Sequence, residues 1–335
     1  MKISSVIKGT GVYVPQRVVT NGEIEERLDY KKYGVRTGLI KVITGVETRR
    51  YAADDEHCSD MAAKAALEAL GNAKIKPEEI DAIIFSATTQ DFFEPATVNV
   101  VQEIIGARNS FCFDLKNVCN SFLSALDVAD SLIKTSKAKN VLIVSGEVFS
   151  RLIKDHAENR GEAEQLSMAH AFGDGGAAFV VSAAEDTDRG IYQSRFLTVG
   201  NYWSNNVMWG GGVRFPRDPE KFYFNITSSN LKNFLTLGIP FIKEKLAAVG
   251  WPVESVDFFV GGQLSKYAVT EVFKQIGVPL ERTIFTLTEW GATGAAGVAM
   301  ATHVAVSTGK IKQGDRVVLF GAGLGITLGI ICIIW

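Results

Sequence analysis

The chain has 335 residues, of which 47% are hydrophobic and 21% charged, and its formal net charge is −2. This composition is typical of a soluble globular protein that is long enough to bury a substantial core. The 35 basic and 37 acidic residues nearly balance, and no lysine- or arginine-rich run occurs. We therefore exclude nucleic acid as a partner.

The two ends of the chain carry no pattern of a membrane span or a secretory signal. The most hydrophobic stretch, residues 324–335, is about half as long as the roughly 20 residues that a membrane-spanning helix needs. Its β-branched residues predict a buried strand. The first residues lack the hydrophobic core of a signal peptide. The 4 cysteines show no CxxC spacing, so we expect reduced thiols in a cytoplasmic protein with no metal or cofactor.

Two segments predict the same order of elements. Residues 66–86 and 245–261 each read as a helix that ends at a glycine, an acidic turn and a short hydrophobic strand. Further matching pairs are strands at 140–146 and 316–321, small-residue helices at 122–139 and 295–312, and strands at 176–182 and 325–334.

This repetition predicts a duplicated α/β protein with halves at 1–185 and 186–335. Continuously hydrophobic strands that alternate with helices favour largely parallel sheets covered on both faces. Residues 150–172 form a charged insertion with two histidines, and residues 201–219 are rich in Gly, Trp and Asn. We expect both to be long loops that build a substrate entrance or a dimer contact.

Cys119 lies between a predicted strand at 110–115 and a helix. The helix is marked by a hydrophobic stripe at Phe122, Leu126, Ala129 and Ile133. A cysteine in the tight turn that opens a helix can be nucleophilic, because the helix dipole and free N–H groups stabilise a thiolate. The alternative is a small buried hydrophobic residue, as expected for Cys58, Cys112 and Cys332. Position alone leaves both interpretations of Cys119 open.

Several motifs follow one another in a familiar order. They are Thr-Gly-Val-Tyr-Val-Pro at 10–15, the cysteine turn, Phe-Gly-Asp-Gly-Gly-Ala-Ala at 172–178, Gly-Ala-Thr-Gly-Ala-Ala at 291–296 and Phe-Gly-Ala-Gly-Leu-Gly at 320–325. With them the chain resembles the condensing enzymes of the thiolase superfamily, and among these the β-ketoacyl-acyl-carrier-protein synthase III family. The resemblance implies a five-layer αβαβα thiolase fold and a homodimer with its active site near the subunit interface.

The resemblance also implies a reaction. Members of the family transfer an acyl group from an acyl-CoA or acyl-carrier-protein thioester to the cysteine and condense it with a malonyl thioester. Cys119 would be the acyl acceptor, and the backbone N–H groups of Cys119 and Gly323 would form the oxyanion hole. Such a donor pair stabilises a tetrahedral intermediate without any side chain.

The chain departs from the family where the enolate of malonate is stabilised. The family has a histidine in a Pro-His-Gln triplet, and here Gly262 stands in its place within Gly261-Gly262-Gln263. The family also has an asparagine in a Gly-Asn-Thr triplet, and here Ala292 stands in its place within Gly291-Ala292-Thr293. The side chains of Gly262 and Ala292 cannot donate a hydrogen bond, so ordinary decarboxylative elongation is in doubt. Leu39 and Ile43 stand where relatives hold the adenine of coenzyme A with tryptophan and arginine.

Two other residues are candidate replacements. Glu94 follows Phe92 and Phe93 in a loop that, in this family, crosses the dimer interface and touches the partner's acyl pocket. There it would act as a base with a raised pKa, or it is a solvated loop carboxylate. The two phenylalanines are expected to line an apolar pocket. His170 could approach the cavity, or it is an ordinary loop histidine.

The sequence leaves three functions open. The first is an acyltransferase that forms an acyl-Cys119 thioester and passes the acyl group to a non-standard acceptor, in fatty-acid-like or specialised-metabolite biosynthesis. The second is a non-catalytic subunit that pairs with an active condensing homologue in a heterodimer. The third is an acyl-thioester hydrolase that clears acyl-Cys119 with water.

Overall fold

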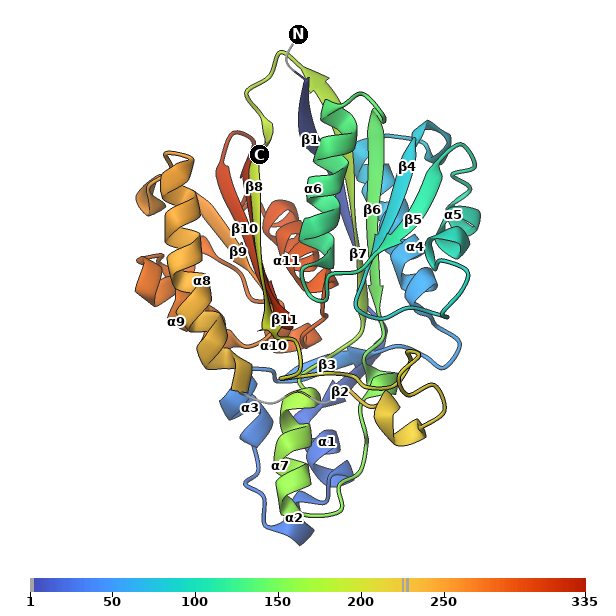
Figure 1. Ribbon diagram of the computed structural model, residues 1–335, viewed down its shortest axis with the longest axis vertical. Helices are drawn as coiled ribbons and strands as arrows, with labels where there is room; N and C mark the ends of the chain where they lie inside the picture. The colour runs from blue at the N-terminus through green and yellow to red at the C-terminus, as the bar shows by residue number, and fades with distance from the viewer. Residues whose placement is uncertain (1–2, 225, 227–228) are drawn as a thin grey trace.

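A computed structural model describes residues 3–224, 226 and 229–335, and two sheets dominate it (Figure 1). Each sheet comes from a different half of the chain. The first has the order β1 (Ile3–Tyr13), β7 (Gly175–Glu185), β6 (Asn140–Glu147), β4 (Ala82–Ser86) and β5 (Phe111–Leu115). The second has the order β8 (Gly190–Tyr202), β11 (Gly325–Ile334), β10 (Arg316–Gly323) and β9 (Phe258–Gly261).

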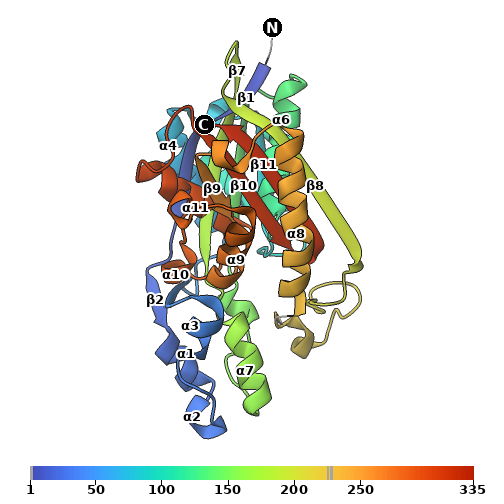
Figure 2. The same cartoon turned by 90° about the vertical axis from the view of Figure 1, so that its left-hand side faces the viewer.

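Three layers of helices alternate with the two sheets. The outer face of the first sheet is covered by α4 (Cys58–Ala73) and α5 (Val98–Ile105), and α6 (Ser121–Lys134) and α11 (Ala296–Ser307) lie between the sheets. The outer face of the second sheet is covered by α8 (Ser229–Ala248) and α9 (Lys266–Ile276), which Figure 2 shows in front of its strands. The predicted five-layer αβαβα architecture is therefore confirmed.

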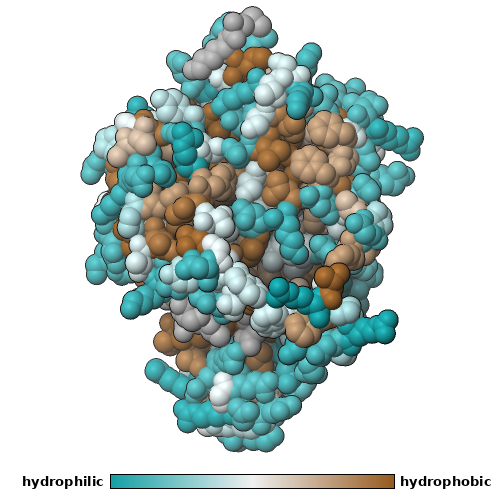
Figure 3. Space-filling model, in the orientation of Figure 1, coloured by the Kyte–Doolittle hydropathy of each residue, from teal (hydrophilic) through white to brown (hydrophobic). Residues whose placement is uncertain are grey.

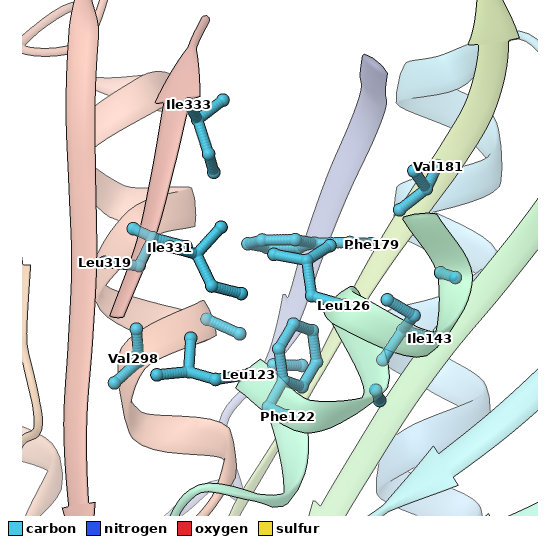
Figure 4. Packing of buried hydrophobic residues seen from close by; sticks show 14 of the residues in the cluster. Phe122, Leu123, Leu126, Ile143, Phe179, Val181, Val298, Leu319, Ile331 and Ile333 are labelled. Atoms are coloured by element: carbon cyan, nitrogen blue, oxygen red, sulfur yellow. The ribbon is translucent and has the colours of Figure 1, made fainter. Parts of the chain in front are cut away.

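The largest hydrophobic cluster fills the middle layer. In Figure 4, Phe122 and Leu126 of α6 point toward Phe179 of the first sheet, while Val298 of α11 faces Leu319 and Ile331 of the second. The rings of Phe122 and Phe179 meet edge to face with centroids 4.9 Å apart. Because this cluster takes residues from both sheets, the two halves of the chain share one core. The division at residue 185 remains a prediction.

The prediction of largely parallel sheets is wrong. β4 is parallel to β5 and β6, and β9 to β10, but β7 and β11 run antiparallel to both of their neighbours. β11 follows β10 directly through Leu324, and the chain after β6 returns to the same edge of the sheet at Gly175. Continuous hydrophobic runs reveal that a strand is buried on both faces, but not its direction.

The insertion at 150–172 is not a long loop. It contains α7 (Arg160–Ala169), which packs in a subdomain at the bottom of Figure 1 with α1 (Asn21–Arg27), α2 (Tyr30–Tyr33), α3 (Leu39–Thr44) and the hairpin β2 (Arg17–Thr20)–β3 (Thr48–Tyr51). Residues 203–218, by contrast, form neither helix nor strand, as predicted.

The remaining elements are short. They are α10 (Leu287–Trp290) and the 3₁₀ turns η1 (Pro77–Glu79), η2 (Ser150–Leu152), η3 (Pro219–Phe222), η4 (Val253–Ser255) and η5 (Leu280–Arg282). One predicted boundary is wrong, because α4 continues through Gly71 and ends at Ala73, followed by Lys74 in the left-handed conformation. No helix within the described residues is long and apolar enough to cross a membrane.

Candidate active site

A strained turn presents Cys119 at the start of α6. The residue before it, Val118, has φ +52°, a conformation that a β-branched side chain rarely adopts. The Ser121 hydroxyl holds the turn, since its oxygen accepts from the N–H of Asn117 at 2.7 Å and it donates to the carbonyl of Val118 at 2.7 Å. The amide of Asn120 donates to the carbonyl of Thr327 on β11 at 2.9 Å. These contacts fix Cys119 between the two sheets.

Cys119 faces an apolar cavity. The walls come from α8, α9, the ends of β9, β10 and β11, and the segments around Phe172 and Ala292. Among the described lining residues, Cys119 is the only one with a titratable side chain. The cavity therefore suits a hydrocarbon chain attached to, or brought up to, the sulfur.

Gly323 lies directly beside the backbone of Cys119. A methyl group on Gly323 would be 3.4 Å from the Cys119 nitrogen and 2.9 Å from the Thr327 methyl group, so only glycine lets β10 approach this closely. The two backbones that the resemblance implies for an oxyanion hole are thus adjacent. Their role in binding an oxyanion remains a prediction.

Gly262 and Ala292 line the same cavity as Cys119. A methyl group on Gly262 would find its nearest described neighbours at 3.8 and 3.9 Å, in Gly321 and Ala322, so the position has room for a side chain. Ala292 is fixed by backbone hydrogen bonds of 2.9 Å to Ala171 and Gly173. The cavity wall at both positions therefore offers the sulfur no side-chain donor.

The surroundings of Cys119 disfavour its thiolate form. Burial raises its pKa to about 12, and the nearby carboxylate of Glu147 adds to this effect. Its own backbone N–H opposes the shift. Burial by the apolar walls therefore opposes the thiolate that the helix start is expected to stabilise, and the nucleophilic role of Cys119 remains a prediction.

A comparison with known proteins assigns the family. The model of 3-oxoacyl-[acyl-carrier-protein] synthase III matches residues 113–200, and the model of its C-terminal part matches residues 246–335. The β-ketoacyl-[acyl-carrier-protein] synthase III of Rhodobacter capsulatus is 34% identical over 100% of both chains, and that of Clostridium perfringens is 32% identical over 98% of both. The chain belongs to the 3-oxoacyl-[acyl-carrier-protein] synthase III family.

Solved structures agree on the thiolase fold of this synthase III family. The enzyme from Aquifex aeolicus superposes with a TM-score of 0.85 at 29% identity, covering 99% of this chain and 100% of that chain. A variant of OleA from Xanthomonas campestris has a TM-score of 0.89 at 24% identity, with 99% and 98% covered, and shows the fold alone. The fold and an enzyme of the condensing, acyl-transferring type follow from this membership.

Glu94, Phe92 and Phe93 lie outside the cavity of their own chain. All three side chains are exposed, Phe93 to 67%, in the loop between β4 and α5. None of them lines the cavity that contains Cys119. That the loop reaches the active site of a second synthase III subunit therefore remains a prediction.

His170 is buried away from the sulfur. Its Nε2 lies 3.0 Å from the carbonyl oxygen of Lys154 and its Nδ1 lies 3.4 Å from the Tyr51 hydroxyl, so both ring nitrogens have partners in the subdomain. Burial lowers its pKa to about 4, which keeps the ring neutral. His170 does not line the cavity that contains Cys119.

The two residues that stand where relatives hold adenine lie in different places. Ile43 lines the cavity, and Leu39 packs against the subdomain core.

Sequence reasoning missed Glu147. This fully buried carboxylate at the end of β6 accepts the N–H groups of Thr88 at 2.7 Å, Thr89 at 2.9 Å and Ala295 at 3.0 Å, and the Thr89 hydroxyl at 2.8 Å. Burial raises its pKa, and the four donors oppose that shift. The available signal was a glutamate that closes an otherwise hydrophobic strand.

Gln263 was also missed as a structural residue. Its amide nitrogen donates to the carbonyls of Gly261 at 2.9 Å and Ile284 at 3.3 Å, and its oxygen accepts the N–H groups of Thr286 at 3.0 Å and Leu287 at 3.4 Å. The side chain is therefore fully used in joining β9 to the segment before α10. It cannot replace the donor missing at Gly262.

Proposed function

We propose that this chain is an acyltransferase that forms an acyl-Cys119 thioester from an acyl-CoA or acyl-carrier-protein donor. The observation that carries the proposal is the position of Cys119 on an apolar cavity, next to the backbone of Gly323. The curated relatives are named as acyl-carrier-protein synthases, which supports a thioester donor.

The acyl transfer balances without a further reactant. The Cys119 sulfur attacks the thioester carbonyl, a new carbon–sulfur bond forms, and the bond to the carrier sulfur breaks. The proton that Cys119 loses ends on the leaving carrier thiol. Since the pKa of the free thiol is about 12, attack coupled to proton loss is favoured over a preformed thiolate.

The acceptor in this proposal is not a malonyl thioester that loses CO2. An enolate at the sulfur would need hydrogen-bond donors, and Gly262 and Ala292 supply none from their side chains. The acceptor that avoids this requirement is an oxygen or nitrogen nucleophile, which forms no enolate. The alternative acceptor is another acyl thioester with Glu94 of a second subunit as base, and its enolate would need donors other than the side chains of Gly262 and Ala292. In each case the acceptor attacks the acyl carbon and Cys119 regains its proton.

A homodimer in which this loop reaches the partner fits the surface. β5 is an edge strand with exposed Phe111, and Figure 3 shows hydrophobic side chains gathered around the strands beside α6. Asp114 of β5 accepts the N–H groups of Thr97 at 2.8 Å and Val98 at 3.0 Å. A second copy that pairs with β5 would therefore also meet the loop with Glu94.

One observation favours the second candidate, a non-catalytic subunit that completes the site of an active homologue. Neither Gly262 nor Ala292 offers a side-chain hydrogen-bond donor to the cavity, as expected of a subunit that does not perform the chemistry itself. Hydrolysis is less well supported, because the described lining residues include no base for water.

The fate of the acyl group separates these functions. Purified protein is incubated with an isotopically labelled acyl thioester, then with malonyl thioester, a second acyl thioester, or amine and alcohol acceptors, and the products are identified by mass spectrometry. Our proposal predicts transfer to a non-malonyl acceptor, reduced at least tenfold by Glu94→Gln if the acceptor is an acyl thioester. The exposed Glu103→Gln is the control. Release of the labelled acyl group only as the free acid would contradict the proposal. A β-ketoacyl product formed with malonyl thioester would also contradict it.

A further inference from the structure

The cavity continues well beyond Cys119, under helix α8. A smaller cavity that includes Cys119, Gly323 and Thr88 shares only Phe234 with the described part of α8. The larger cavity additionally includes Leu235, Gly238, Phe241 and Ile242 of α8 and Ala268, Val269 and Val272 of α9. These helix residues therefore line a part of the cavity that lies away from Gly323.

Gly238 leaves the space under α8 open. The residue is buried, yet a methyl group on it would have no described heavy atom within 4 Å, apart from its neighbours in the helix. A buried position without contacts means that the missing side chain faces the empty cavity. Since Gly238 lies in the interior of a helix, its conformation is one that any residue with a Cβ can adopt.

Gly262 leaves another part of the wall of the same cavity open. Its nearest described neighbours would stand 3.8 Å from a methyl group, and it lines the cavity together with Cys119. A larger side chain at this position would project into the cavity. The two glycines are thus two points at which a bulky residue would narrow the cavity.

The lining of this part fits only an apolar ligand. Phe241, Ile242, Val269 and Leu328 are each at least nine-tenths buried within the chain and belong to one hydrophobic cluster with Phe320. A pantetheine arm would bring amide groups here without partners, at a cost that a hydrocarbon avoids. Each methylene that enters such a space favours binding about fourfold.

We infer that the space between α8, α9 and the second sheet binds the tail of a long unbranched fatty acyl group whose carbonyl lies at Cys119. The inference rests on the proposed acyl transfer to that residue. It assigns the chain-length determinant to Gly238 and the α8–α9 surface of the same subunit, separate from the exposed Phe92 and Phe93.

The test uses a variant whose side chain fills the space at Gly238. Gly238→Leu and the unmodified protein are incubated with acyl-CoA thioesters from butyryl to palmitoyl, and the rate of adduct formation is followed by intact-protein mass spectrometry. We expect palmitoyl transfer to fall at least tenfold while butyryl transfer is unchanged. Gly71→Leu is the matched control, because this glycine also lies in a helix but is exposed, and it should keep the full profile.

Equal rates for palmitoyl transfer in Gly238→Leu and the unmodified protein would overturn the inference, as would an equal fall for all chain lengths. If no donor acylates the protein, the proposed function fails. The inference about the acyl pocket is then tested by fatty-acid binding alone. Displacement of a fluorescent fatty acid by palmitate is then measured in Cys119→Ala with and without Gly238→Leu. A tenfold weaker affinity with leucine supports the acyl pocket, and an unchanged affinity refutes it.

Discussion

Gly262 and Ala292 decide what Cys119 can do, because both lie in the cavity wall and neither side chain can donate a hydrogen bond. We predict that Gly262→His combined with Ala292→Asn gives decarboxylation of a malonyl thioester. Each restored donor is worth roughly 10²–10³ in rate, so the increase should be at least ~100-fold. Release of CO2 is the measurement.

The matched control for this pair is Gly262→Leu with Ala292→Val, which fills similar space without donors. If the control decarboxylates as fast as the histidine–asparagine variant, the missing donors are not the reason for the altered chemistry. The histidine should also slow palmitoyl transfer, because it narrows the cavity toward Gly238.

The pKa of Cys119 gives a prediction about pH. A thiol with a pKa of about 12 exists as thiolate at pH 8 on the order of a thousandfold less often than a free cysteine, so alkylation should be slow and should rise throughout the alkaline range. Peptide mass spectrometry after iodoacetamide treatment measures this, with free cysteine as the reference. Half-maximal labelling near pH 7 would contradict a raised pKa at Cys119.

At the scale of elements, Glu147 joins the end of β6 to the loop after β4 and to the start of α11. Replacing its carboxylate with an amide leaves several buried N–H groups without a charged acceptor. We predict that Glu147→Gln lowers the free energy of unfolding by about 2–4 kcal/mol in urea titration. Glu185→Gln, also at a strand end but exposed, should be neutral. Equal stability of both variants would mean that Glu147 does not hold these elements.

Elements with a strong periodic pattern could be predicted from the sequence. The strands β4, β6, β9 and β10 lie within a residue or two of their hydrophobic runs, and α6 follows its stripe. β1 and β8 were missed, because β1 contains several serine, threonine and glycine residues and most of β8 is at least partly exposed. Those strands are specified by pairing with β7 and β11, which local sequence does not show.

The candidate site was predictable to a similar degree. The strand-to-helix change located Cys119, and the resemblance located Gly323, Gly262 and Ala292. The roles of Glu147 and Gln263 were not predictable, because their partners are backbone groups of segments far away in the sequence. The raised pKa of Cys119 was not predictable for a related reason, since it comes from burial, which depends on segments far away in the sequence.

For the whole molecule, the exposed edge strand β5 predicts self-association. Phe111 is 48% exposed, and its ring stacks on that of Phe113 with centroids 6.4 Å apart. We predict that Phe111→Glu shifts a dimer to monomers in sedimentation velocity, because a charge would be buried in the interface. Leu280→Glu, which changes a similarly exposed residue of η5, should leave the dimer intact. A dimer that persists in Phe111→Glu would place the interface elsewhere.

The central claim for the molecule is that Cys119 accepts an acyl group. Intact-protein mass spectrometry after incubation with acyl-CoA and acyl-carrier-protein thioesters tests it most directly, with Cys119→Ala alongside. We predict a mass increase of one acyl group that is absent from the alanine variant. If no donor gives an adduct, or if the variant is acylated equally, Cys119 is not the acyl acceptor of the isolated chain.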